Sequence, residues 1–372
     1  MAREPPSTVL APSDQMARRR GSLFDRIMVV LMAWLLGGAY LDVWAHNHLS
    51  GLDSFFTLWH AILYTGYFAL AIFLGAPPLY KLTRGYPWSR SLPDGYMVSL
   101  LGVGMFLLGG VGDLIWHTVF GLERHFEVAL SIPHLTLKFS ALLIGCGPLS
   151  AAWRRIALEE TQGWSALWPM VLTAAFVLSG LTYFTGLANP FAYPWAVVGF
   201  RAGVAAGTEI SSLAGYTQVP NEVGQVLGVL AIIVHTGMLM GLILLLVRRW
   251  VLPFGSLALI FSINASLMAA VYGPTQYGLV PIMTLSGLAA DGLLGWLRPS
   301  VARVAALRVF AFAVPTILYM LYFVVLLWSR GVEWPMTVWT GSIVVAGLFG
   351  LGVSYLVVPP ESQPEGGGHG SC

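Results

Sequence analysis

Long apolar segments separated by short polar ones run through nearly the whole chain. Ten of them are about 20 residues long, which is the length at which an α-helix crosses the hydrocarbon core of a bilayer. The sequence therefore predicts an all-α protein, a polytopic membrane bundle of about ten transmembrane helices. The expected spans are residues 25–46, 55–76, 94–118, 128–150, 165–187, 223–247, 254–275, 278–297, 306–329 and 335–358.

The composition supports this class. Of 372 residues, 57% are hydrophobic and only 10% are charged, which is too apolar for an ordinary soluble domain. The polar ends, residues 1–24 and 359–372, are expected to be disordered cytoplasmic tails around a transmembrane domain at 25–358. The first segment has no early apolar core, so we expect no cleavable signal peptide. The two cysteines suggest no disulfide framework.

The basic residues predict how the helices are oriented. With the amino end inside, ten spans place most of the 19 Lys and Arg residues on the cytoplasmic side. The exceptions are Arg124, Lys138, Arg201 and Arg330. The positive-inside rule thus favours a multi-pass protein with both termini in the cytoplasm. An error of one helix would reverse the later loops and spoil this match.

One polar constellation lies at the end of the first expected span. Asp42 and His46 are four residues apart and share a helix face, and His60 opens the next span after a short polar loop. Ionisable groups are expensive inside a bilayer, so such a set is a functional candidate. Two imidazoles and one carboxylate suit iron, copper or zinc and leave positions open for a substrate. The alternative is a set of interfacial polar side chains that bond to each other and to water.

The same pattern recurs one hairpin later, at Asp113, His117 and His134. In the predicted topology both constellations lie in the extracytoplasmic leaflet. The two hairpins have the same orientation, so helices 1–2 and 3–4 could form a parallel repeat. We therefore predict metal ligands at all six residues. They could build two mononuclear sites, one dinuclear site, or one site and a relic.

Two charged residues near the second constellation are candidate catalytic groups. Lys138 lies four residues after His134 inside a span, where a Lys must pair or snorkel. It could pair with Asp113 or a loop Glu, or else donate a proton or anchor an anionic substrate. Glu127 and Glu123 lie in the preceding loop and could serve as a base or as ligands. The alternative for this loop is a solvated charged face.

Polar residues in the later spans are predicted to be structural. His235 lies mid-helix without a clear partner for haem ligation, so a hydrogen bond to Ser, Thr or Asn of a neighbouring helix is expected. Asp291 is expected to pair with Arg298 or another basic group near the inner surface. Coupling of Asp291 to transport is the alternative.

The stretch Asp42-x-x-x-His46 … Phe-Phe-Thr-Leu-Trp-His60 resembles the C subunit of particulate methane and ammonia monooxygenases. That family carries an Asp-x-x-x-His motif at a helix end, a polar loop, and a His after a Phe-Thr-bearing segment. These three residues bind copper within the membrane region. The resemblance covers about 20 residues and implies that Asp42, His46 and His60 bind copper for oxidation chemistry. The loop is one residue longer here, and the chain has a second copy and more spans than that subunit.

Three classes of function follow. We favour a membrane metalloprotein that uses copper, or else iron or zinc, to oxidise a small apolar substrate. The second class is an intramembrane zinc hydrolase acting on lipids, although HExxH is absent. The third is a non-enzymatic transmembrane subunit of a larger complex, or a transporter. Expected partners are the lipid bilayer, a small apolar or lipid substrate, and further membrane subunits or copies of the chain; nucleic acid is not expected.

Overall fold

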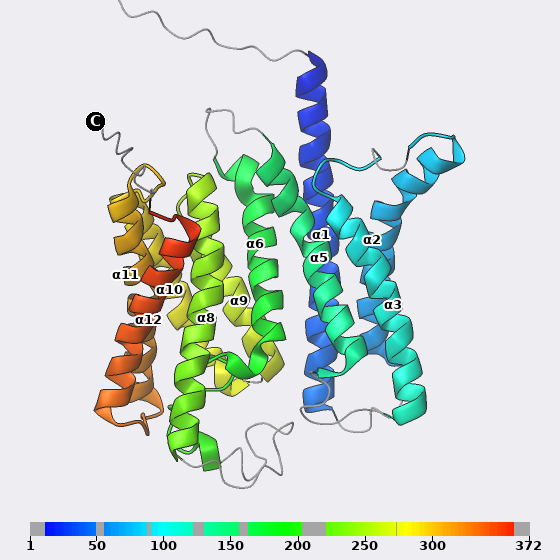
Figure 1. Ribbon diagram of the computed structural model, residues 1–372. Coiled ribbons are helices and arrows are strands. Elements are labelled where there is room, and N and C mark those ends of the chain that lie inside the picture. The colour runs from blue at the N-terminus through cyan, green and yellow to red at the C-terminus, as the bar shows by residue number, and fades with distance from the viewer. Residues whose placement is uncertain are drawn as a thin grey trace, which may run out of the picture.

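The structure is a computed structural model that describes residues 12–49, 56–87, 91–121, 130–155, 163–202, 221–272 and 274–360. Within these ranges it consists of ten long α-helices and two short 3-10 helices, with no β-strand (Figure 1). Each of the ten α-helices corresponds to one predicted span. The α-helices are α1 Pro12–His48, α2 Leu58–Thr83, α3 Met97–Phe120, α5 Ile132–Arg154, α6 Trp164–Phe184, α8 Asn221–Arg249, α9 Ser256–Tyr272, α10 Val280–Leu297, α11 Val304–Ser329 and α12 Met336–Val357. The 3-10 helices are η2 Gly186–Ala188 and η4 Pro274–Leu279.

The helices have the length and polarity of membrane spans. In the described part of the chain, nine are long and apolar enough to cross a membrane, and α9 is a shorter apolar helix of 17 residues. At 1.5 Å per residue, α9 is about 25 Å long, close to the hydrocarbon thickness of a bilayer. The prediction of an all-α, polytopic bundle is therefore confirmed.

The first helix starts earlier than the apolar pattern predicts. α1 begins at Pro12, so residues 12–24, expected to belong to a disordered tail, are helical. This polar segment contains Gln, Met, Ala and Arg, which favour helix, and Pro fits the first turn. It extends beyond the neighbouring helices at the same end of the bundle as the last turn of α12 (Figure 1). Residues 1–11 and 361–372 lie outside the described residues.

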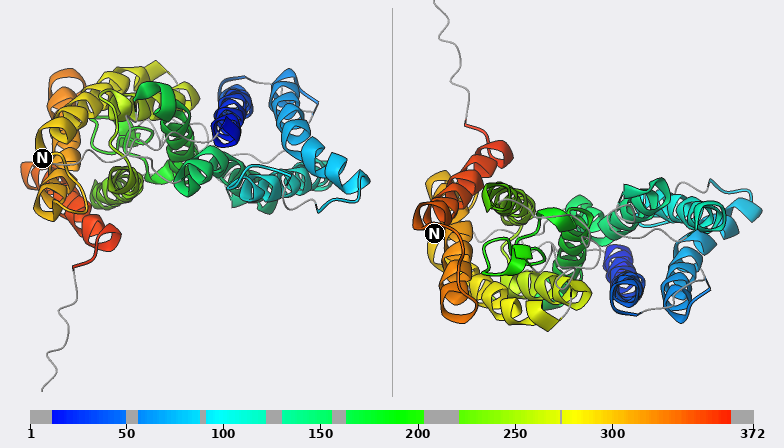
Figure 2. Two further views of the ribbon diagram at one scale, coloured as in Figure 1. Left: turned by 90° about the horizontal axis from the view of Figure 1, so that it is seen from above. Right: turned by 90° about the horizontal axis from the view of Figure 1, so that it is seen from below.

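The helices form two bundles that lie side by side (Figure 2). α1, α2, α3 and α5 make the amino-terminal bundle, whose core includes Leu70, Tyr96 and Ile144. α6 and α8 to α12 make the carboxy-terminal bundle, whose core includes Phe261 and Phe310. α1 also packs against α6 and α9, and α5 packs against α6, so these helices join the two bundles.

Glycine lets the helices of the amino-terminal bundle pack closely in pairs. A Cβ atom on Gly38 of α1 would lie 2.8 Å from Leu63 Cα of α2. A Cβ on Gly102 of α3 would lie 2.8 Å from the backbone nitrogen of Ile144 in α5. A larger residue would force either pair apart. α1–α2 and α3–α5 thus form two tightly packed antiparallel pairs, and the last turns of α1 and α3 lie at the same end of the bundle (Figure 1).

Candidate metal centres

The first predicted constellation converges at the turn of the α1–α2 hairpin. His46 lies in the last turn of α1, Asp42 one turn before it, and His60 in the first turn of α2. The Nε2 atoms of His60 and His46 lie 3.4 and 3.8 Å from Asp42 Oδ2. One ligand atom from each residue lies within 4.8 Å of the others. Ligands bound at about 2.0–2.2 Å to one ion lie roughly 3–4 Å apart, so this group, triad 1, is close to that spacing.

The second constellation has the same construction in the α3–α5 hairpin. His117 lies in the last turn of α3, Asp113 one turn before it, and His134 in the first turn of α5. The Nε2 atoms of His117 and His134 lie 3.3 and 3.5 Å from Asp113 Oδ1. Asp113 is only 2% exposed. This group, triad 2, also offers three ligand atoms within 4.8 Å of one another.

The surroundings of triad 1 fit a cation. Asp42 is buried, and its Oδ1 atom has no hydrogen-bond partner among the residues that the structure describes. An uncompensated carboxylate in an apolar environment is strongly unfavourable, and a bound cation would offset that penalty. Imidazole and carboxylate are donors that copper, iron and zinc all accept. The residues present therefore suit a transition-metal ion.

In triad 2, the Nδ1 atom of each imidazole ring has a polar partner on the side of the ring away from Asp113. His117 Nδ1 lies 3.3 Å from the carbonyl oxygen of Gly121, and His134 Nδ1 lies 2.7 Å from Ser131 Oγ. A carbonyl oxygen can only accept a hydrogen bond, so His117 Nδ1 carries a proton, and in the neutral ring Nε2 is the nitrogen that can bind a metal. Metal-binding histidines are oriented in this way by a partner on the other ring nitrogen.

A hydroxyl residue precedes the second histidine of each triad by three positions. Thr57, the N-cap of α2, accepts a hydrogen bond from the backbone N–H of His60 at 3.1 Å. Ser131, the N-cap of α5, instead contacts the ring of His134. The sequence analysis did not identify Thr57 or Ser131 as part of the two sites. The signal that could have identified Thr57 and Ser131 is a repeated pattern at the start of a span, in which a Ser or Thr stands three residues before a His.

Tyr64 lies between the two triads. It is one turn after His60 on α2, and its ring centroid is 6.2 Å from that of His60. A Cβ on Gly110, one turn before Asp113 on α3, would lie 3.1 Å from the Tyr64 hydroxyl oxygen. The triads therefore belong to one polar region at one end of the amino-terminal bundle.

Lys138 borders this region on α5. Its Nζ atom lies 5.2 Å from the centre of the Tyr183 ring of α6, a cation–π arrangement. It lies one turn after His134 on the same helix. The pairing of Lys138 with Asp113 stays a prediction. The other catalytic candidate, Glu127, lies outside the described residues, as does Glu123.

The polar residues of the carboxy-terminal bundle have structural partners. His235 Nδ1 lies 2.9 Å from the Tyr319 hydroxyl, so its partner is a tyrosine and not the expected Ser, Thr or Asn. Asp291 accepts hydrogen bonds from the backbone N–H groups of Leu257 and Ala258, at 3.1 and 2.9 Å. The predicted pairing of Asp291 with Arg298 is therefore wrong. The open amide groups at the amino end of α9 attract this carboxylate instead.

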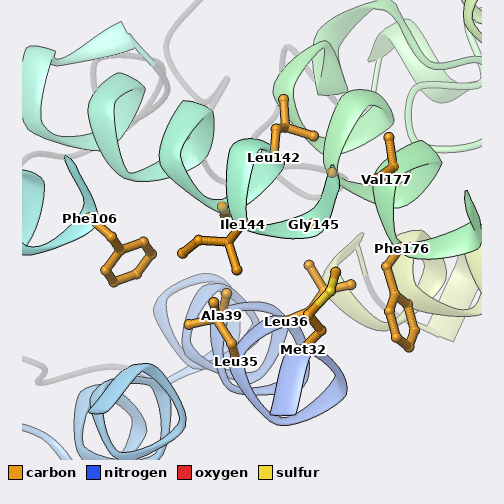
Figure 3. A pocket seen from close by; sticks show the side chains of 12 residues that line it. Met32, Leu35, Leu36, Ala39, Phe106, Leu142, Ile144, Gly145, Phe176 and Val177 are labelled. Carbon is orange, nitrogen blue, oxygen red and sulfur yellow. The ribbon is translucent and has the colours of Figure 1, made fainter. Parts of the chain in front are cut away.

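An apolar cavity of about 50 Å³ lies among the helices of the bundle (Figure 3). Its walls come from α1, α3, α5 and α6, and include Ala39, Phe106 and Leu142. Ala39 is one turn before Asp42 on α1, and Leu142 is one turn after Lys138 on α5. The cavity thus begins about one helical turn from the polar region.

The described structure shows a membrane-type helical protein with two Asp/His groups, each built around a buried aspartate, that could each hold a metal ion. No protein-family model, no curated protein and no solved structure matches this chain. Its function is therefore inferred from the two triads and from the residues around them.

Proposed function

We propose that this protein is a membrane metalloprotein that holds one transition-metal ion in each triad. The observation that carries the proposal is the recurrence of one construction in two hairpins. In each, Asp and His one turn apart at the end of one helix meet a His in the first turn of the next, with both Nε2 atoms 3.3–3.8 Å from one carboxylate oxygen. Interfacial hydrogen bonding could explain one such group. Two matched groups favour a shared ligand.

Copper is the metal that we favour, with iron and zinc as alternatives. Two neutral imidazoles and one carboxylate suit all three. The resemblance of the stretch from Asp42 to His60 to the copper-binding hairpin of the monooxygenase C subunit supports copper. A bound ion would supply Lewis acidity and, if it is copper or iron, a redox centre.

The distribution of charge supports an extracytoplasmic position for the triads. Most of the described Lys and Arg residues lie at the end of the bundle opposite the triads. By the positive-inside rule, that basic end faces the cytoplasm and the triads lie in the outer leaflet. The basic residues at that end include Lys81, Arg84, Arg154, Arg155, Arg248, Arg249, Arg298 and Arg303.

The apolar cavity supports a small apolar substrate. A space of about 50 Å³ with apolar walls would admit a molecule of a few non-hydrogen atoms and would reject a charged one. We infer that such a molecule is oxidised beside the triads by a small oxidant such as dioxygen, with electrons from a separate donor. Lys138 would hold a positive charge, or a transferable proton, one turn from His134.

The proposal is tested on the full-length protein, purified in detergent. Elemental analysis identifies the bound metal, and X-ray absorption at its edge reports whether imidazole and carboxylate bind it. His60→Ala and His134→Ala should each remove most of the metal from one triad. His48→Ala is the matched control, because His48 lies in the last turn of α1 but bonds Trp44 and belongs to neither triad.

Unchanged metal content in both triad variants would overturn the proposal. Loss of metal in His48→Ala equal to that in His60→Ala would also contradict it, since the effect would then not be specific to the triad. Tightly bound zinc without any redox response would turn the functional assignment to hydrolysis of a lipid.

A further inference from the structure

A large basic cavity lies at the end of the carboxy-terminal bundle, far from the triads. Its volume is about 660 Å³, within the range of ligand-binding pockets. It is bounded by the ends of α8 and α10 and by the connections that follow them. Four arginines line it: Arg248, Arg249, Arg298 and Arg303. We call this cavity the arginine pocket.

Among the residues that the structure describes, acidic side chains do not balance the charge of the arginine pocket. Asp291 is the one acidic residue among its described lining residues, and its carboxylate is engaged by the backbone amides at the amino end of α9. Arg248 donates to the carbonyl oxygen of Val357 at 3.0 Å. The guanidinium groups of Arg298 and Arg303 make no hydrogen bond or ion pair with the described residues. Two forked donors are therefore available to an anion.

The backbone of Arg298 is a second, independent sign of a ligand. It ends α10 with a φ of 47°, the left-handed conformation, and it is the one non-glycine residue with positive φ in the described chain. Glycine or asparagine usually occupies this position at a helix end, because a side chain is strained there. A strained residue that presents a free guanidinium group into a pocket indicates a functional role for that group.

The pocket also has an apolar margin. Val251 is 84% exposed and Phe254 is 67% exposed, and both line it. Arginine forks match the oxygens of phosphate, and apolar side chains at a membrane surface contact acyl chains. Basic pockets between transmembrane helices bind phospholipid headgroups in this way. We propose that the arginine pocket binds the phosphate headgroup of an anionic phospholipid.

Native mass spectrometry of the full-length protein in detergent can measure this binding. Phosphatidylglycerol is titrated against phosphatidylcholine with the same acyl chains, and inorganic phosphate is titrated separately. Arg298→Gln combined with Arg303→Gln should weaken phosphatidylglycerol binding by about tenfold or more, because each lost charge-assisted hydrogen bond has an effect of roughly that size. The control combines Lys81→Gln with Arg84→Gln, which removes the same charge at the same end of the bundle but outside the pocket, and should change binding less than about twofold.

Arg298→Gly separates binding from folding. Glycine relieves the strained backbone, so this variant should melt at the same temperature as the wild type or higher, yet bind phosphatidylglycerol more weakly. Full affinity in this variant, or equal losses in the pocket and control pairs, would overturn the proposal. Inorganic phosphate that binds as tightly as phosphatidylglycerol would also overturn it, since the ligand would then be a free anion. Metal content should be unaffected in all these variants, so this test is independent of the triads.

Discussion

The two bundles of this protein use buried polar side chains in different ways. In the carboxy-terminal bundle, single polar residues bond to a neighbouring helix. Asn264 donates to Thr182 at 2.6 Å, His235 contacts Tyr319, and Asp291 accepts from the amides of α9. In the amino-terminal bundle, Asp25 likewise accepts a hydrogen bond from Tyr96 at 2.7 Å, but the Asp and His residues of the two triads gather in threes around one carboxylate oxygen. These triads lie at helix ends, where a polar loop and solvent are near.

This difference helps to distinguish a candidate metal-binding residue from a polar residue that only stabilises helix packing. A lone polar residue with a hydrogen-bond partner on the next helix stabilises the bundle. A buried carboxylate such as Asp42 is different, because two imidazole nitrogens approach one oxygen while the other has no hydrogen-bond partner among the described residues. When both imidazoles are neutral, that arrangement is unfavourable, and a bound cation would offset the cost.

The largest expected effect contrasts Asp42 with Asp291. Asp42→Asn keeps the shape of the side chain but removes the anionic ligand, so metal affinity at triad 1 should fall more than about 100-fold. This loss exceeds the one expected when a residue that only hydrogen-bonds a metal ligand is removed. Asp291→Asn should leave metal affinity unchanged. Equilibrium dialysis of the metal-free variants checks both. Equal metal affinities for the two variants would break the contrast between the bundles.

The next effect separates the two hydroxyl residues that precede the triad histidines. Ser131→Ala removes the contact to His134 Nδ1 and should weaken metal binding at triad 2 by about 10–100-fold. Thr57→Ala removes only a helix cap, so it should lower the free energy of unfolding by about 1 kcal/mol and leave metal affinity nearly unchanged. Metal competition against a coloured chelator measures the affinities. A weaker metal site in Thr57→Ala than in Ser131→Ala would contradict the roles assigned to them.

The stability of the metal-free protein should respond with opposite sign in the two bundles. Asp42→Asn removes a buried charge whose Oδ1 atom has no hydrogen-bond partner among the described residues, so the chelated protein should become more stable by about 1–3 kcal/mol. Asp291→Asn weakens hydrogen bonds to a charged acceptor and should destabilise the protein by about 1.5–3 kcal/mol. Denaturation midpoints in the presence of a strong chelator give both signs. Destabilisation by both substitutions would show that the Asp42 carboxylate is compensated without a cation.

The smallest effect on metal is expected from filling the apolar cavity. Ala39→Leu places additional carbons in the cavity and should leave metal content unchanged within about twofold, because Ala39 is no ligand. It should abolish binding of xenon, which occupies small dry cavities of this kind. Xenon NMR on the wild type and the variant tests this. Undiminished xenon binding in Ala39→Leu would show that xenon does not bind in this cavity, and the cavity would then not support the proposed substrate site.

Much of this architecture could be predicted because its signals are local. The ten spans follow from the lengths of apolar runs, and the shared face of Asp42 and His46 follows from the four-residue spacing. A short loop is enough to bring His60 back to the same end of the hairpin. The early start of α1 was missed because its first turns are polar, and apolar length carries no information about them.

Contacts between distant parts of the chain could not be predicted in this way. Tyr64 reaches Gly110, and Lys138 lies over Tyr183, only because separate hairpins and bundles pack together. Asp291 was assigned a charged partner, but its position beside the start of α9 gave it backbone amides instead. The side chains that join the triads to their surroundings therefore depend on tertiary packing and not on sequence spacing.

The most direct measurement of the central claim is the number of metal ions bound per chain. Metal is titrated into chelator-treated, full-length protein, and bound metal is counted against protein. We predict about two ions for the wild type, because the chain carries two triads. His46→Ala with His60→Ala, and His117→Ala with His134→Ala, should each leave about one ion, and the fourfold variant none. A wild type that binds no metal, or a fourfold variant that binds as much as the wild type, would contradict the account.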